Sequence, residues 1–224
     1  MRAPALAAVL DGPRTGRLIS ARAALDRLRE GNARFVADVS RRGVTSRRKR
    51  RELVSGQEPF AIVLGCSDSR VPAELVFDQG LGDLFVIRVA GNIVAPSQIG
   101  SVEFAAERFK TRLVVVLGHS SCGAIDATLE QLQRPSEEQS PGLRSIVDRI
   151  RPAVQDLVTL EPTHGREQLW REAVRANTRH AANQLRHGSE ILEHLIRHDG
   201  LAVVGAEYSL ESGVVAFFDG VPES

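Results

Sequence analysis

Short apolar runs recur from residue 59 onward, and most of them are followed closely by glycine, aspartate or serine. They occupy residues 60–64, 84–89, 113–117, 201–204 and 214–218. Continuous apolar runs of this length are typical of strands that are buried on both faces. Helical patterns lie between them, notably at 98–109 and 122–132, and such alternation predicts parallel β-α-β units. We therefore predict an α/β fold with a central, mostly parallel sheet of four to five strands flanked by helices.

The regions outside these runs have helical patterns of their own. Residues 18–38 predict an amphipathic N-terminal helix with Ser20 as its N-cap and a break at Gly31. After a polar break at 133–142, residues 143–160 and 166–198 predict two long helices. At 224 residues we expect one domain overall. It would comprise a disordered N-terminus at 1–17, a helical arm at 18–58 and an α/β domain at 59–224.

Charge and hydropathy narrow the classes of partner. Lys plus Arg (29) nearly equals Asp plus Glu (28), so the net charge gives no reason to expect nucleic acid or an anionic membrane as partner. The basic segment 41–52 is interpreted as a solvated loop and helix face. The longest apolar runs fall well below the roughly 20 residues of a membrane span, and residues 3–10 are too short for a secretory core. We expect a cytoplasmic protein.

Two motifs follow two of the apolar runs directly. They are G-C-S-D-S-R-V at 65–71 and G-H-S-S-C-G-A at 118–124, and they contain both cysteines of the chain. In an open parallel sheet, ligands bind in a crevice outside the carboxyl ends of strands, so Cys66 and His119 would project to one place. Cys122 would lie at the first turn of a helix, whose dipole favours a thiolate.

Two thiolates and one imidazole form a set that suits zinc and leaves a fourth tetrahedral position for water or substrate. Asp68 is the candidate for that position. From the residues alone, a second interpretation stays open, in which both thiols are simply buried and the histidine is a core residue. Other nucleophile sites do not fit: Cys66 and Arg70 are too close for a C-x5-R phosphate loop, position 122 is not the glycine of a nucleophile elbow, and C-x-x-C is absent.

The pair C-S-D-S-R and G-H-S-S-C-G-A resembles the signature of the β-class carbonic anhydrases. The resemblance extends to G-N-A-R-F near residue 31, G-D-L-F-V-I-R at 82–88, A-G-N at 90–92 and G-S-V-E-F-A at 100–105. It implies one zinc ion per chain, bound by Cys66, His119 and Cys122. It also implies reversible hydration of carbon dioxide to bicarbonate and a proton by attack of a zinc-bound hydroxide, and it makes 59–224 the zinc-binding catalytic domain.

The same resemblance assigns Asp68 and Arg70 to a catalytic dyad beside the open position. In an open state, Arg70 would hold Asp68, and Asp68 would orient the attacking water. In a closed state, Asp68 would itself become the fourth zinc ligand. The family's smallest unit is a dimer in which the N-terminal helix wraps the partner, and this implies a homo-oligomer built from dimers.

Several positions depart from the two regulatory classes of that family. A glutamine that marks one class aligns with Gly80, beside Gln79, and a tryptophan that marks the bicarbonate-regulated class aligns with Val63. Arg88 and Tyr208 match two bicarbonate-site positions of the latter class, so the choice between the classes stays open. The resemblance also places Val71, Gln79 and Asn92 near the carbon dioxide pocket, with packing or turn roles as the equal alternative, and none of the three is assigned a catalytic role.

The remaining histidines do not predict a second metal site, and two alternative functions are considered. His194 and His198 share one helix face, but H-L-I-R-H lacks the glutamate of a zinc-protease helix, and His180, His187 and His194 are interpreted as surface or interface residues. Hydrolysis of carbon disulfide or carbonyl sulfide by the same hydroxide is the alternative enzyme. A homologue used only for binding is disfavoured because every zinc ligand and the dyad are present.

Overall fold

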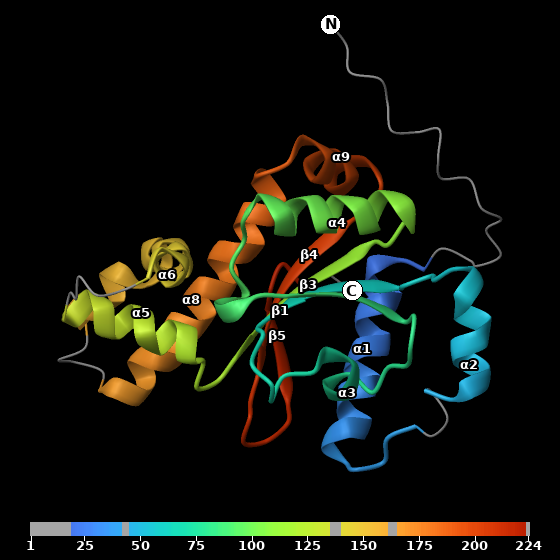
Figure 1. The fold of residues 1–224 in the computed structure, drawn as a ribbon, viewed down its shortest axis with the longest axis horizontal. Coiled ribbons are helices and arrows are strands. Elements are labelled where there is room, and N and C mark those ends of the chain that lie inside the picture. Colours follow the sequence, from blue (N-terminus) through green and yellow to red (C-terminus); the bar gives the residue numbers. More distant parts are fainter. Residues whose placement is uncertain (1–18, 42–44, 135–139, 161–164, 223–224) are drawn as a thin grey trace, which may run out of the picture.

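A five-stranded sheet runs through the centre of the molecule, in the strand order β2-β1-β3-β4-β5 (Figure 1). The computed structural model describes residues 19–41, 45–134, 140–160 and 165–222. β1 to β4 run parallel, and β5 is antiparallel to β4. The strands are β1 (Ala61–Gly65), β2 (Leu84–Arg88), β3 (Leu113–His119), β4 (Ala202–Tyr208) and β5 (Val215–Asp219). The predicted fold class, a mostly parallel sheet flanked by helices, is confirmed.

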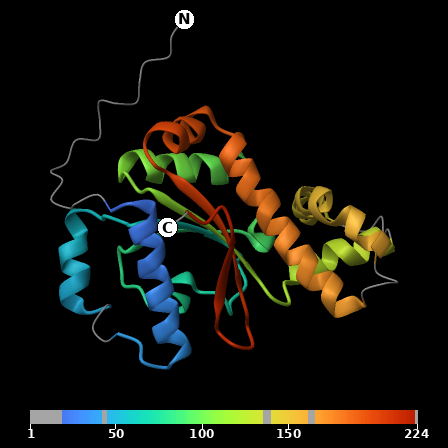
Figure 2. The same ribbon diagram turned by 180° about the vertical axis from the view of Figure 1, so that it is seen from behind.

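Helices cover both faces of the sheet, which explains why β1 and β3 are apolar at nearly every position and fully buried. Views from opposite sides place α1, α2 and α3 on one side of the sheet and α4, α8 and α9 on the other (Figures 1 and 2). The helices are α1 (Ala21–Val36), α2 (Arg47–Glu52), α3 (Ala73–Val76), α4 (Pro96–Arg108), α5 (Gly123–Gln133), α6 (Pro141–Val154), α8 (Arg166–His187) and α9 (Glu190–His198). A third apolar cluster, which contains both cysteines, joins α5, α6 and α8 at one end of the sheet.

α1 is one continuous helix, so the predicted break at Gly31 is wrong. A Cβ at residue 31 would clash with the carbonyl oxygen of Phe77, and the glycine therefore serves the close approach of two backbones. Asn32, the next residue, is buried and donates to the carbonyls of Val76 and Gly213. Helix α1 thus packs into the same core as the sheet.

The two long C-terminal helices also need correction. The predicted helix at 166–198 is divided into α8 and α9 at Gly188, where a Cβ would clash with the carbonyl of Gln184. The side chain of Ser189 then accepts a hydrogen bond from the N–H of Leu192 and so begins α9 as its N-cap. The predicted helix at 143–160 begins earlier, at Pro141, and becomes a 3-10 helix (η4, Gln155–Leu160) after Val154.

The predicted disorder of residues 1–17 concerns a segment outside the described residues. Among the helices that the structure describes, none combines the length and the apolar character required to cross a bilayer.

Candidate metal centre

Two loops leave adjacent parallel strands at the same edge of the sheet. Gly65 at the end of β1 pairs with Leu117 of β3, so the first ligand loop (residues 66–72) and the second ligand loop (residues 119–122) begin side by side. His119 is the last residue of β3, and Cys122 is the N-cap of α5. The prediction that both motifs meet at the carboxyl edge is confirmed by this register.

The side chains of Cys66, His119 and Cys122 converge at this edge. Their potential ligand atoms all lie within 4.8 Å of one another, and the two sulfur atoms are 4.0 Å apart. The three residues are 5%, 0% and 4% exposed. No other group of three such residues occurs in the part of the chain that the structure describes. Both thiols are free, so a disulfide does not compete with metal binding.

The orientation of His119 suits a metal ligand. Its Nδ1 lies 2.9 Å from the carbonyl of Ser120, which can only accept, so Nδ1 carries the proton and Nε2 keeps its lone pair. Nε2 is buried and has no hydrogen-bond partner. A buried polar atom without a partner is costly, and a metal ion between the imidazole and the two sulfurs would satisfy it. The donor set therefore fits a borderline-soft ion such as zinc.

The two thiols also shift each other's pKa in opposite directions. The pKa of Cys66 is lowered to about 4, chiefly by a hydrogen bond from the Cys122 thiol, against the opposing effect of burial. The pKa of Cys122 is raised because it supplies that hydrogen bond, and because burial and the neighbouring thiolate oppose a second negative charge. A second thiolate beside the first is disfavoured by charge repulsion, and a cation between the two sulfurs would remove that repulsion.

Asp68 and Arg70 form an ion pair beside this cluster. Arg70 donates from Nη2 to Asp68 Oδ2 at 2.7 Å, and from Nε and the main-chain N to Oδ1, both at 2.9 Å. These side-chain hydrogen bonds are the main reason why the pKa of Asp68 lies well below its usual range. Asp68 Oδ2 is 4.0 Å from His119 Nε2. The structure thus brings the predicted dyad next to the predicted ligands.

Arg88 and Gly91 contact the first ligand loop in ways that the sequence motifs do not indicate. Arg88 Nε donates to the carbonyl of Cys66 at 3.0 Å, and its Nη2 donates to the carbonyl of Asp68 at 2.6 Å. The N–H of Gly91 donates to Cys66 Sγ at 3.3 Å. Arg88 belongs to G-D-L-F-V-I-R and Gly91 to A-G-N, and only the resemblance indicated these two segments, because hydrogen bonds to main-chain atoms leave no pattern in the sequence.

Other neighbours suggested by the sequence have clear structural contacts. The side chain of Gln79 turns toward the N-terminal helix: Oε1 accepts from Arg27 and Arg41, and Nε2 donates to Phe77. Asn92 is 2% exposed, and its Nδ2 has no hydrogen-bond partner. Val63, Val71 and Tyr208 are buried in the apolar cluster that contains α1. Any part that these residues play in substrate binding stays a prediction.

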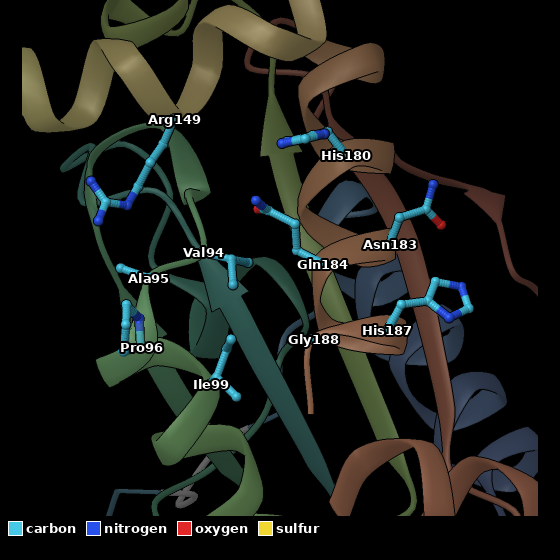
Figure 3. A pocket seen from close by; sticks show the side chains of 10 residues that line it. All are labelled: Val94, Ala95, Pro96, Ile99, Arg149, His180, Asn183, Gln184, His187 and Gly188. Atoms are coloured by element: carbon cyan, nitrogen blue, oxygen red, sulfur yellow. The ribbon is translucent and has the colours of Figure 1, made fainter. Parts of the chain in front are cut away.

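A separate groove of about 700 Å³ lies between the start of α4, α6 and α8 (Figure 3). Val94, Pro96 and Ile99 line one side, and Arg149 of α6 and His180 of α8 are among the polar residues around it. Burial lowers the pKa of His180. The groove contains none of the predicted ligands, so it is separate from the candidate metal centre.

The fold and the site together define an α/β protein with a Cys2His group that could hold a metal ion at the carboxyl edge of a parallel sheet. A protein-family model described as "Carbonic anhydrase" matches residues 61–215. Carbonic anhydrase 2 of Mycobacterium tuberculosis is 38% identical over 196 residues, which cover 85% of this chain and 89% of that protein. A carbonic anhydrase of Mycolicibacterium smegmatis is 47% identical over 132 residues, or 59% of this chain and 64% of that protein.

A solved structure agrees. The β-carbonic anhydrase CcaA has a TM-score of 0.66 and 28% identity, with 90% of each chain covered. Because the family model spans most of the chain and the M. tuberculosis relative aligns with nearly all of it, the protein belongs to the β-carbonic anhydrase family.

Proposed function

We propose that this protein catalyses the reversible hydration of carbon dioxide to bicarbonate and a proton, with one zinc ion per chain. The observation that carries the proposal is the unpartnered Nε2 of His119, in a group of three residues whose potential ligand atoms lie within 4.8 Å of one another and beside the Asp68–Arg70 pair. Membership of the β-carbonic anhydrase family supports the same reaction.

Cys66, His119 and Cys122 would hold the zinc ion. Bound zinc lowers the pKa of a water molecule toward neutrality and so supplies a hydroxide nucleophile near neutral pH. Two thiolate ligands would neutralise the formal charge of the ion, so the bound zinc would acidify a water molecule less than a zinc held by three histidines. A protein group that orients the nucleophile is therefore more valuable here.

Asp68 is the group that would do this. Its carboxylate is ionised because Arg70 donates three hydrogen bonds to it, and an ionised carboxylate accepts a hydrogen bond from the attacking water and directs its lone pair at the carbon of carbon dioxide. Arg70 also donates to the carbonyl of Ser121 at 3.3 Å, which links the two ligand loops. We also propose a closed state, in which the Asp68–Arg70 pair would open and the Asp68 carboxylate would join Cys66, His119 and Cys122 in holding the metal.

Stopped-flow proton release on mixing with carbon dioxide tests the reaction. We expect turnover by the purified protein with zinc near one per chain, and its loss in Cys66→Ser. Ser69→Ala, an exposed change in the same loop, is the matched control and is expected to keep the wild-type rate. A protein that holds one zinc per chain and shows no hydration at alkaline pH would contradict the proposal.

The same assay separates the alternative chemistry. Carbon disulfide and carbonyl sulfide are linear molecules that the same nucleophile attacks, so each is supplied in place of carbon dioxide. A higher kcat/KM for either would make the protein a hydrolase on this scaffold. X-ray absorption at the zinc edge across pH about 6 to 9, a range that brackets the acidification of zinc-bound water, tests the switch: a water ligand throughout would refute the closed state.

We also propose a homodimer as the smallest unit. β2 lies at the edge of the sheet, and Val36, Val39, Val54 and Phe104 expose between 45% and 87% of their surface, which supports association of apolar surfaces. Sedimentation velocity is expected to show at least a dimer, and a monomer at micromolar concentration would contradict this. The cytoplasmic location stays a prediction.

A further inference from the structure

Cys66 receives a hydrogen bond that originates outside both ligand loops. The donor is the main-chain N–H of Gly91, 3.3 Å from Sγ. Gly91 lies in the short turn η3 (Ala90–Asn92), between β2 and α4, and has φ +70°. N–H donors to a ligating sulfur set the orientation of the ligand and its electron density. The position of this turn therefore bears on the metal site.

The other end of the same residue is held by a distant helix. The carbonyl of Gly91 accepts a 2.8 Å hydrogen bond from Nδ2 of Asn177. Asn177 lies within α8, 86 residues further along the chain, and is 2% exposed. A buried amide side chain is costly unless its hydrogen bonds are made. The hydrogen bond to Gly91 offsets this cost for Asn177 and connects α8 to the turn.

Gly91 depends on such an anchor. Its left-handed φ is favourable for glycine, but a glycine without anchors populates many conformations. It cannot be fixed by a side chain, because a Cβ at this position would lie 2.8 Å from Cδ1 of Ile150 and 3.1 Å from Cβ of Ala124. The hydrogen bonds at its N–H and its carbonyl therefore fix its orientation within a turn that the hydrogen bond from the Asn92 N–H to the carbonyl of Val89 closes.

We infer that Asn177 is a positioning residue for the metal ligand Cys66. By holding the carbonyl of Gly91, Asn177 keeps the N–H of Gly91 directed at Sγ. The inference rests on the proposed function, because it takes Cys66 as a zinc ligand. It goes beyond that function because neither cysteine motif includes any residue of α8.

The test measures the metal site directly. Zinc affinity is determined by competition with a chromophoric chelator, and the cobalt(II)-substituted protein is examined for its sulfur-to-cobalt charge-transfer band. For Asn177→Leu, which keeps the volume and removes the donor, we expect a loss of zinc affinity of about 10- to 100-fold. We also expect the band to move to lower energy, because a sulfur without its N–H donor holds its electrons less tightly. Asn177→Ser is expected to change both quantities in the same direction, and it decides the question if the leucine variant does not fold.

Thr178→Val is the matched control. Thr178 is the next residue of α8 and is fully buried, but its hydroxyl donates to Val174 and its side chain packs against Gly118 and Gly205. We expect a lower Tm with wild-type zinc affinity and an unchanged cobalt band. Wild-type affinity and band in folded Asn177→Leu or Asn177→Ser would overturn the inference and leave the proposed function intact. Failure of the wild type to bind zinc, or binding unaffected by Cys66→Ser, would overturn the metal site itself.

Discussion

The two ligand loops end neighbouring strands of one sheet, yet their environments differ. The second loop supplies His119 and Cys122, which are 0% and 4% exposed, and passes directly into α5. The first loop supplies one buried ligand, Cys66, and then turns outward, so that the side chain of Asp68 is 16% exposed and that of Arg70 is 54% exposed.

We propose that this difference separates the residues that would hold the metal from those that would act on the substrate. Ligands that are buried in an apolar cluster keep their geometry because the packing around them resists displacement. A charged pair at the rim is held only by hydrogen bonds, and it remains accessible to water and substrate. Arg88 reinforces the exposed loop through the carbonyls of Cys66 and Asp68. Substitutions of Cys122, Asp68 and Arg88 test whether the two loops differ in this way.

The largest effect is expected from Cys122→Ser in the second loop. A neutral hydroxyl is a much poorer zinc ligand than a thiolate, and only two strong ligands would remain. We expect zinc to be lost during purification and hydration to fall by at least about 1,000-fold, in keeping with a loss of the metal-generated nucleophile. Metal analysis and stopped-flow assays on the same sample check this, and full zinc content with near-normal turnover would remove the distinction between the loops.

Asp68→Asn in the first loop should leave zinc in place and lower kcat. The amide is nearly isosteric, but it lacks the negative charge that accepts the hydrogen bond from the attacking water. We expect a decrease of about 100-fold, within the usual range for a positioned acid or base. Zinc content close to one per chain is the essential companion measurement. If zinc is lost together with activity, the rim residue belongs to the metal-holding set after all.

A smaller effect is expected from Arg88→Gln. The shorter, uncharged side chain cannot make both charge-assisted hydrogen bonds to the first loop, so the dyad would be held less tightly. We expect kcat/KM to fall about 10-fold, since small misplacements of a positioned group are costly. Arg88→Lys retains the charge and one hydrogen bond, and it should recover part of the rate. Equal rates for the glutamine variant and the wild type would show that this clamp does not position the loop.

Asp78→Asn concerns a third region, in which Arg34 of α1 and Arg41 pair with the carboxylate, and it should affect stability alone. Burial opposes ionisation of Asp78, but hydrogen bonds from Arg34 and from the main chain of Arg41 prevail and lower its pKa. A lowered pKa stabilises the folded state above the unfolded-state pKa of about 4, and that stability is lost as the pH falls through the folded-state value.

We expect the variant to be about 2 kcal/mol less stable at neutral pH, in line with the loss of one partner from a largely buried pair that is still partly screened by solvent. Urea unfolding at pH 7 and at acidic pH measures the difference, which should shrink at the lower pH. Asp26→Asn, an exposed ion-pair change on α1, is the control and should alter stability little. A change in zinc content or kcat would link the arm to the metal site.

Much of the fold could be predicted because buried parallel strands have a simple pattern. The apolar runs at 60–64 and 113–117 indicated β1 and β3 within one or two residues, since both faces of these strands are covered and every position must be apolar. Two of the errors occurred at glycines. Gly31 does not break α1, whereas Gly188 ends α8. Whether a helix continues through a glycine depends on the backbone that packs against that glycine, which the sequence does not show.

The amino-acid sequence by itself determined the chemistry of the candidate centre. Two thiols, one imidazole and an acid two residues before an arginine are properties of residue type and spacing, and they follow strands whose carboxyl ends must share an edge. Only the tertiary structure decided what holds those groups in place: the proton on His119 Nδ1, the Arg88 clamp, and the Asn177–Gly91–Cys66 chain. These contacts use main-chain atoms and join segments up to 86 residues apart, and main-chain hydrogen bonding is common to nearly all residue types. Their partners are therefore chosen by packing and leave no pattern along the chain.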